Sequence, residues 1–278
     1  SNDEPLAAEL DVLIQKKAAA GNLDKSLSLA GAEFTVEYFA SLEESSEVER
    51  TWIFTTDEEG KVRLDASYLK DGSDELYTND DGKALLPIGT YRIRETKAPK
   101  GFWINGEVKV VKLKPVKDEN GKLSISEYEV PSFVEKEQTV RVRVRKFGES
   151  ENKALAGAHF ELKRIADADG KPLKQEETRV EKIVTDEDGV AEKGGLLPGI
   201  YELKETKSPD GYALSKKAYK IEAIGAEGDT IVTRDDGEKE FLYESQIGNA
   251  LIKLEISKLT LSDGKKHSLS GAEFLLKD

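Results

Sequence analysis

The sequence predicts an all-β protein made of tandem β-sandwich domains, and three observations support this. A small-residue motif occurs three times, as LAGAEF at 29–34, LAGAHF at 155–160 and LSGAEF at 269–274. Two complete copies also share a longer block, GTYRIRETKAPKGF at 89–102 and GIYELKETKSPDGY at 199–212. Between these landmarks, short runs of alternating polarity are separated by turn signals, which is typical of a sandwich.

The repeats divide the chain into two complete copies and a fragment. They predict domains at 1–137 and 138–250, followed by the truncated start of a third copy at 251–278. A chain of 278 residues is long enough for two such domains, each with its own core. The fragment holds too few strands to bury a core, so we expect it to fray or to lean on the second copy unless another chain completes it.

The elements of the first copy follow from its alignment with the second. Residues 5–20 are rich in good helix formers, yet the alignment favours a strand at 12–16. The first copy also carries an insertion between residues 60 and 85, which includes Tyr68 and a polar stretch at 71–81. We expect a surface excursion that leaves the order of the core strands unchanged.

The second copy opens on residues 139–146, which alternate strictly and predict a strand. Further strands are predicted at 160–162, 179–184, 200–204, 218–222 and 240–243. Turn signals separate them at 169–170, 188–189, 198–199, 209–211 and 236–237.

Composition excludes several classes of function. Lysine plus arginine number 42 against 55 acidic residues, and a net charge of −13 would repel nucleic acid and anionic membranes. Cysteine is absent, so neither disulfides nor thiolate metal sites are expected. No apolar run reaches the roughly 18 residues that span a bilayer, and we expect a mature or excised segment without a membrane span.

Strand parity in the second copy turns three polar side chains inward. Successive residues point to opposite faces of a strand, so Lys146 continues an inward apolar row, and Glu205 and Asn249 do the same on two other strands. Burial favours a neutral amine and a protonated carboxyl. An amine beside an asparagine can form a Lys–Asn isopeptide bond and release ammonia. The alternative is a buried Lys–Glu ion pair with no bond, and parity alone leaves both open.

The combination of these motifs resembles a known family. A lysine-ended strand before LAGAEF or LAGAHF, the TDEDG turn, the LLPGIYELKETKSPDGY block and a last strand ending in asparagine are similar to Cna protein B-type, or SpaA-like, domains of Gram-positive surface adhesins and pilins. The resemblance covers both full copies and the fragment. It implies an immunoglobulin-like sandwich in which Lys146 bonds to Asn249, with Glu205 as catalyst.

The first and third copies depart from this pattern. Lys16 and Glu95 match the lysine and the glutamate, with Glu95 a possible catalyst, but the residue at the acceptor spacing is Glu137. The segment 131–137 contains no asparagine or aspartate. We therefore expect Lys16 to lack an acceptor, unless the strand order differs and Asn105 or Asn120 serves. Lys258 is the corresponding lysine of the third copy, also without an acceptor.

Other candidate sites are weak. The acidic turn at 167–170 has no flanking helices and a poor match to a calcium loop, so a hairpin turn is the better interpretation. The two histidines, His159 and His267, have no partner suggested by the sequence, which argues against a hydrolase triad. We expect no metal and no cofactor.

The predicted function is structural. The sequence indicates a stalk or pilin segment of an extracellular, cell-wall-anchored protein of a Gram-positive bacterium, non-enzymatic apart from self-catalysed isopeptide formation. Its partners would be other pilin subunits, a host matrix protein or a glycan, but not nucleic acid. One alternative is an adhesin module that recognises a host matrix protein or glycan through the first domain. Another is an accessory domain of a carbohydrate-active enzyme.

Overall fold

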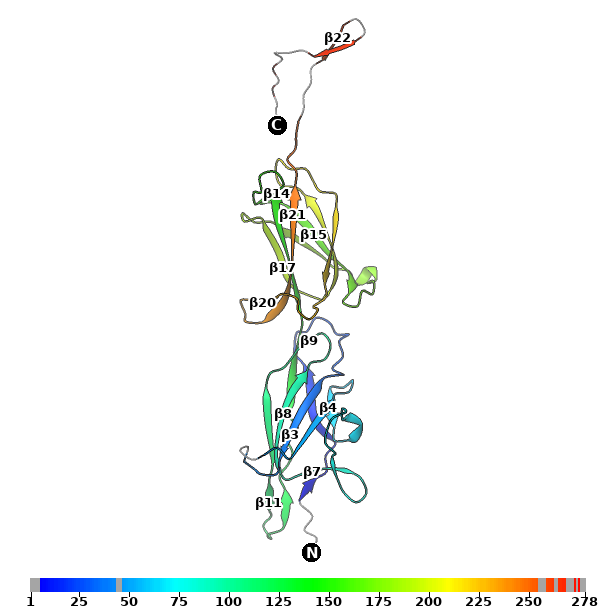
Figure 1. Cartoon of the computed structure of the whole chain (residues 1–278), viewed down its shortest axis with the longest axis vertical. Helices are drawn as coiled ribbons and strands as arrows, with labels where there is room; N and C mark the ends of the chain where they lie inside the picture. Colours follow the sequence, from blue (N-terminus) through cyan, green and yellow to red (C-terminus); the bar gives the residue numbers. More distant parts are fainter. Residues whose placement is uncertain are drawn as a thin grey trace. The chain divides into compact units, whose positions relative to one another are not determined.

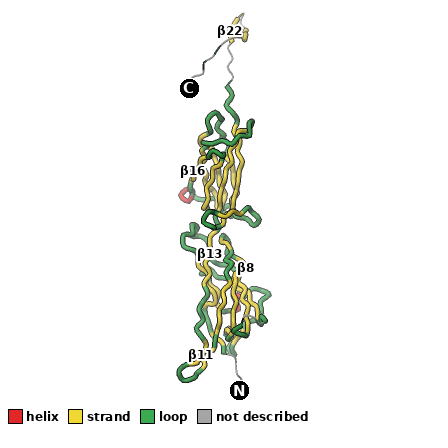
Figure 2. Tube along the Cα trace, turned by 90° about the vertical axis from the view of Figure 1, so that its left-hand side faces the viewer, coloured by secondary structure: helices red, strands yellow, loops and turns green. Residues whose placement is uncertain are grey.

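The computed structural model describes residues 6–43, 47–254, 259–262, 265–268, 273 and 275. The chain forms two compact units, one of residues 1–140, 195–198 and 225–241 and the other of residues 141–194, 199–224 and 242–278 (Figure 1). Strands and loops make up nearly all of both units, as Figure 2 shows, and this confirms the predicted all-β class. The boundaries at 137 and 250 remain predictions.

The first domain contains two four-stranded sheets. One sheet has the order β10-β8-β3-β4, and all its pairs are antiparallel. Its strands are β3 (Glu33–Phe39), β4 (Arg50–Thr55), β8 (Gly89–Lys97) and β10 (Val108–Leu113). The other sheet has the order β5-β2-β13-β9. Its strands are β2 (Val12–Ala18), β5 (Lys61–Arg63), β9 (Phe102–Trp103) and β13 (Ser132–Glu137).

The first and last strands of the two four-stranded sheets, β2 and β13, run parallel side by side, with Phe133 opposite Lys16. The other pairs of their sheet are antiparallel. The helix formers near the N-terminus therefore lie in a strand, because a central position in a sheet outweighs local propensity. Side chains of both sheets share one core, with Ile14 and Phe133 from one and Phe34, Trp52 and Ile93 from the other.

The insertion leaves the order of the core strands intact, as predicted, but it is more than a surface excursion. It contains η1 (Ala66–Tyr68), β6 (Tyr77–Thr78) and β7 (Ala84–Pro87), and β7 also pairs with β1 (Ala7–Ala8). The Tyr77 ring packs edge-on against Trp52, whose Nε1 donates to the carbonyl of Glu75 at 3.1 Å. The insertion thus covers one end of the core. A separate hairpin joins β11 (Pro115–Lys117) and β12 (Leu123–Ile125).

The second domain repeats this plan. One sheet has the order β16-β15-β18-β19, which matches β4-β3-β8-β10 of the first domain. The other has the order β17-β14-β21-β20, and its first three strands match β5-β2-β13. The strands are β14 (Val140–Gly148), β15 (His159–Asp167), β16 (Val180–Val184), β17 (Val190–Leu196), β18 (Gly199–Lys207), β19 (Ala218–Ala223), β20 (Ile231–Thr233) and β21 (Lys239–Asn249), with a short η2 (Gln175–Glu177).

The first and last strands of the second domain, β14 and β21, also run parallel. Phe241 N donates to Thr139 O at one end, and Glu149 N donates to Asn249 O at the other, each at 3.0 Å. Burial alternates along β14, with Val142 and Val144 fully buried on the inner face. Both domains therefore join their first and last strands directly.

Beyond residue 254, β22 (Leu259–Ser262) and β23 (Lys265–Ser268) form a hairpin. Half of the predicted fragment at 251–278, including Lys258, lies outside the described residues. No helix in the part of the chain that the structure describes is both long and apolar enough to cross a bilayer.

Candidate lysine–carboxyl sites in the two cores

Lys146, Glu205 and Asn249 lie together inside the second domain. Lys146 comes from β14 and Asn249 from the neighbouring β21, while Glu205 comes from β18 in the opposite sheet. Their exposed fractions are only 1%, 6% and 2%. The parity argument therefore describes all three side chains correctly as inward-facing.

The Glu205 carboxylate connects the other two groups. Its two oxygens accept from Asn249 Nδ2 at 2.8 and 2.9 Å, and its Oε1 lies 3.8 Å from Lys146 Nζ. Lys146 Nζ also donates to the carbonyl of Ile247, two residues before Asn249 on the same strand, at 3.1 Å. Among the described residues, the buried Asn249 Oδ1 has no hydrogen-bond partner. One carboxylate thus contacts both an amine and an amide nitrogen.

The surroundings favour the uncharged amine. Burial lowers the pKa of Lys146 below its ordinary value, although the Glu205 and Glu149 carboxylates oppose this. A lysine whose pKa is lowered by burial has a larger fraction in the nucleophilic amine form. The site therefore holds a potential nucleophile next to a group that can carry its proton.

Backbone contacts fix the lysine on its strand. Lys146 N donates to Gly189 O at 2.7 Å, and Leu155 N donates to Lys146 O at 3.0 Å. Gly189 has φ +73°, and a Cβ there would lie 2.5 Å from Lys146 O. The turn of the TDEDG motif therefore requires glycine where it meets the lysine. Thr185 in the same motif donates to Leu155 O and accepts from Ala158 N.

The first domain builds the same frame with a glutamate in place of the asparagine. Lys16 Nζ donates to Glu95 Oε1 and also to Glu135 Oε1, and all three side chains are buried. Glu95 Oε2 accepts from Asn105 N at 2.6 Å, whereas Glu135 Oε2 has no hydrogen-bond partner among the described residues. Sequence reasoning missed Glu135, because it looked only for asparagine or aspartate.

The two frames correspond position by position. Lys16 N donates to Gly60 O as Lys146 N donates to Gly189 O, both at 2.7 Å. Glu95 pairs in register with Phe34, and Glu205 pairs with Phe160. On the last strand, Glu135 follows a buried Phe133 by two residues, just as Asn249 follows a buried Ile247. Glu135 therefore occupies the position of the asparagine.

The acceptors considered from the sequence do not contact Lys16 in the described structure. The Glu137 carboxylate instead accepts from Leu23 N at 2.6 Å and Asp24 N at 2.8 Å. Asn105 lies beside the site but directs its Nδ2 to Val134 O at 3.0 Å. Asn120 lies at the exposed turn between β11 and β12. The strand order is the expected one, so neither asparagine replaces the acceptor.

Other sequence candidates prove to be structural. Asp167 Oδ1 accepts from Asp169 N and Lys171 N at 2.9 Å each, which are the hydrogen bonds of a turn. Within the described ranges, no group of three or more histidine, aspartate and glutamate side chains is arranged to hold a metal ion.

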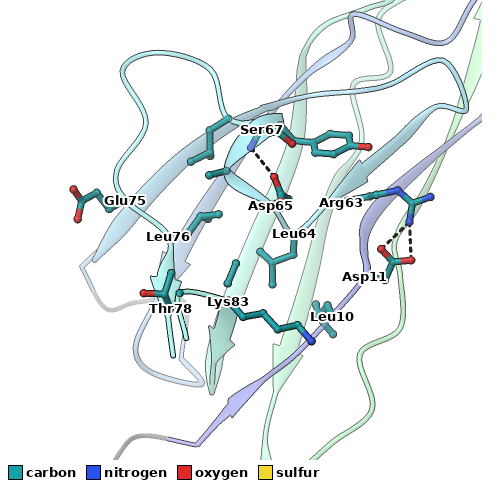
Figure 3. A pocket seen from close by; sticks show the side chains of 15 residues that line it. Leu10, Asp11, Arg63, Leu64, Asp65, Ser67, Glu75, Leu76, Thr78 and Lys83 are labelled. Atoms are coloured by element: carbon teal, nitrogen blue, oxygen red, sulfur yellow. Dashed lines mark hydrogen bonds and ion pairs between the residues drawn. The ribbon is translucent and has the colours of Figure 1, made fainter. Parts of the chain in front are cut away.

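The first domain also has an open hollow of about 770 Å³ beside the insertion (Figure 3). Apolar side chains of Leu10, Leu64 and Leu76 line it, and an ion pair between Arg63 and Asp11 lies at one side. The Arg63 Nη1 atom is 2.7 and 2.6 Å from the two Asp11 carboxylate oxygens.

Comparisons with solved structures find matches at low sequence identity. The Bacillus anthracis TIE protein matches 88% of this chain at 21% identity with a TM-score of 0.54, and the chain spans 34% of its length. The minor pilin GBS52 of Streptococcus agalactiae matches 92% of the chain at 15% identity and TM-score 0.31, over 99% of its own length. The shaft pilin SpaA of Lactobacillus rhamnosus GG matches 90% at 15% identity and TM-score 0.31, over its full length. No curated protein sequence matches the chain.

Each of the two domains is a β-sandwich whose core encloses a lysine beside a glutamate, and this defines the class as tandem β-sandwich domains. The family model described as SpaA, prealbumin-like fold domain, matches residues 17–129 and 140–239. The chain therefore belongs to the SpaA family, which confirms the resemblance found in the sequence.

Proposed function

We propose that this chain is a stalk or pilin segment of an extracellular, wall-anchored protein of a Gram-positive bacterium, whose second domain closes through an amide between Lys146 and Asn249. The observation that carries the proposal is the buried contact of Glu205 with both the lysine amine and the asparagine amide. The family match supports the structural role. The chain is not an enzyme in this proposal, because its only reaction is with itself.

The Lys146 amine attacks the side-chain carbonyl carbon of Asn249. Glu205 first accepts one proton from the Lys146 ammonium, which frees the nucleophile. As the tetrahedral intermediate collapses, Glu205 gives this proton to the departing amide nitrogen and takes the second proton of the lysine nitrogen. The products are one amide, one ammonia molecule and a protonated Glu205, so protons and charge balance. Since Glu205 already holds Asn249 Nδ2, it is placed to protonate the leaving group.

The amide would join β14 to β21, the first and last strands of the domain. Tension applied through the chain would then pass directly between these strands and would bypass the residues between them. This property suits a segment that transmits force along a surface appendage. Other pilin subunits are the natural partners of such a segment.

The mass of the intact chain tests the proposal. We expect a deficit of one ammonia assigned to a cross-linked peptide that contains both Lys146 and Asn249. Glu205→Ala should abolish that peptide, and Gln246→Ala, on an exposed position of the same strand, should keep it. A wild-type digest in which Lys146 is cleaved normally and Asn249 is unmodified would exclude the bond.

A second candidate function, ligand binding by the first domain, draws on the hollow beside the insertion. Its apolar lining and charged side suit a host matrix protein or a glycan with both apolar and polar groups. Binding of the full chain to arrays of matrix proteins and glycans tests it. Leu76→Glu should lower the affinity for any ligand of the hollow by tenfold or more, about 1.4 kcal/mol, whereas Leu123→Glu on β12 should leave the affinity unchanged. Equal effects of the two substitutions on the affinity would show that the ligand does not bind in the hollow.

A further inference from the structure

The first domain holds a buried cluster that the Lys146–Asn249 reaction does not use. Lys16 is 1% exposed, Glu95 6% and Glu135 0%, and the lysine Nζ also lies 5.0 Å from the centre of the Phe34 ring. Two acidic groups and one basic group therefore share a buried site. If all three are ionised, one negative charge stays uncompensated, which is costly in an apolar interior.

The protonation state of Glu135 relieves part of this cost. Burial raises the pKa of Glu135 to about 7, with Lys16 opposing the rise and the adjacent Glu95 carboxylate adding to it. Near neutral pH a large fraction of Glu135 is therefore the carboxylic acid. An amine can condense with a carboxylic acid, whereas a carboxylate repels a nucleophile.

The two oxygens of Glu135 have different surroundings. Oε1 accepts from Lys16 Nζ, but Oε2 is buried without a hydrogen-bond partner in the part of the chain that the structure describes. A buried oxygen without a hydrogen-bond partner destabilises the folded state, because its hydration is lost and not replaced. Loss of this oxygen as water would remove that cost together with the charges of the cluster.

We propose that the first domain closes through an amide between Lys16 Nζ and the side-chain carboxyl carbon of Glu135, with Glu95 as the proton carrier. The bond forms between β2 and β13, the parallel first and last strands. It occupies the place of the Lys146–Asn249 bond in the second domain, but its leaving group is water and not ammonia.

The reaction balances with the three side chains alone. Glu95 starts as a carboxylate, Lys16 as an ammonium and Glu135 as a carboxylic acid. Glu95 takes one proton from Lys16, the amine attacks the Glu135 carboxyl carbon, and the carbon–hydroxyl bond breaks. Glu95 gives its proton to the departing hydroxyl, which leaves as water, and then takes the second proton of the lysine nitrogen. The products are the amide, one water and a protonated Glu95, all uncharged.

This inference does not depend on the bond in the second domain, and a Lys146→Met background separates the two. In that full-length variant we expect a mass deficit of one water, located in a cross-linked peptide that contains Lys16 and Glu135. Wild type should lose one water and one ammonia. If the wild type loses ammonia alone, the first-domain bond is overturned and the second-domain bond stands. If it loses water alone, the second-domain bond is overturned and the first-domain bond stands.

Conservative variants in the same background identify the acceptor and the proton carrier. Glu135→Gln should still form the bond, now with loss of ammonia, and should yield the same cross-linked peptide. Glu95→Gln should abolish or strongly slow it, because the amide cannot accept the proton. Glu137→Gln, two residues along β13, should leave the water loss unchanged.

An unchanged mass in Lys146→Met, with normal tryptic cleavage after Lys16, would overturn the proposal and establish a buried Glu–Lys–Glu ion cluster. A water loss that persists in Glu135→Ala would also overturn it, because the acceptor would then be another residue. Circular dichroism of each variant confirms that it is folded before its mass is interpreted.

Discussion

Lys146 illustrates how the position of a single residue changes its acid–base chemistry. A solvated lysine is almost entirely protonated at neutral pH, but burial in the second domain lowers its pKa. The Glu205 carboxylate can take the proton of the amine, and the Asn249 amide offers a carbonyl carbon that the amine could attack. The same residue type on the exposed face of β14 would have neither property.

The lowered pKa predicts a pH dependence of stability when the bond is blocked. In Asn249→Ala, Lys146 remains a free amine, and the unfolded state keeps its proton up to the ordinary value of 10.5 while the folded state releases it at lower pH. The unfolded state binds more protons in this window, so the free energy of unfolding should rise as pH increases toward 10.5. Denaturant unfolding at several pH values between 7 and 10 measures this change in the free energy of unfolding. The double variant Asn249→Ala/Lys146→Met is the control, and equal slopes in the two would refute the assignment.

The candidate site could be predicted from the sequence to different extents in the two copies. Parity alone turned Lys146, Glu205 and Asn249 inward, because a strand alternates faces whatever its tertiary partners. Glu135 was missed because only asparagine and aspartate were considered as acceptors in the segment 131–137, and the spacing from the next lysine pointed to Glu137. The shared parity of Phe133 and Glu135 was the signal that could have found it.

At the scale of elements, the turns before β5 and β17 determine where the lysines lie. Each turn brings a glycine carbonyl to the lysine N–H, and at Gly189 the approach leaves no space for a Cβ. The strand and its lysine are therefore held by a turn that comes more than forty residues later in the chain. This arrangement links the TDEDG motif to the reactive side chain.

Gly189→Ala should therefore destabilise the second domain more than a glycine change in an open turn. The left-handed backbone alone costs about 1–2 kcal/mol for alanine, and the contact with Lys146 O adds to this. Gly170→Ala is the matched control, because Gly170 has φ +81° and nothing within 4 Å of its Cβ position. Denaturant midpoints compare the two, and equal losses would show that the close contact is unimportant.

Sequence patterns predicted most strands of the second domain but not all of their details. The alternating runs located β14, β16, β18 and β19 closely, because each has one buried face. β17 was not predicted, since its run VAEKGGL contains two glycines and little alternation. The packing of Tyr77 on Trp52 also could not be read from the sequence, because it depends on how the inserted chain returns to the core.

At the scale of the whole molecule, covalent closure would replace the disulfides that the chain lacks. The proposed Lys146–Asn249 bond encloses about 100 residues, for which the chain-entropy model gives roughly 4.7 kcal/mol of stabilisation. Lys146→Met should lower the melting temperature of the second domain by roughly 20 °C by this measure. Calorimetry of wild type and variant measures the shift, with Gln246→Ala as control. A shift no larger than that of the control would contradict closure.

The same bond should change the response to force. An extended chain gains about 3.3–3.6 Å per residue, so unfolding the unlinked second domain would release roughly 350 Å of contour length. Pulling the wild-type chain from its two ends should not show this step, whereas Lys146→Met should. Single-molecule extension measures the step directly. Its presence in the wild type at full length would rule out a closed second domain.

Because the proposed bonds join the first and last strands of each main fold, a bond can form only in a domain that has been synthesised completely. The lysine strand is synthesised first and its acceptor strand last, with the whole domain between them. A chain that is interrupted, truncated or cleaved before the final strand has every other part of the fold but cannot be sealed. The fraction of cross-linked domains in a population would thus measure the fraction of complete domains. A defective molecule could be recognised by its free lysine amine.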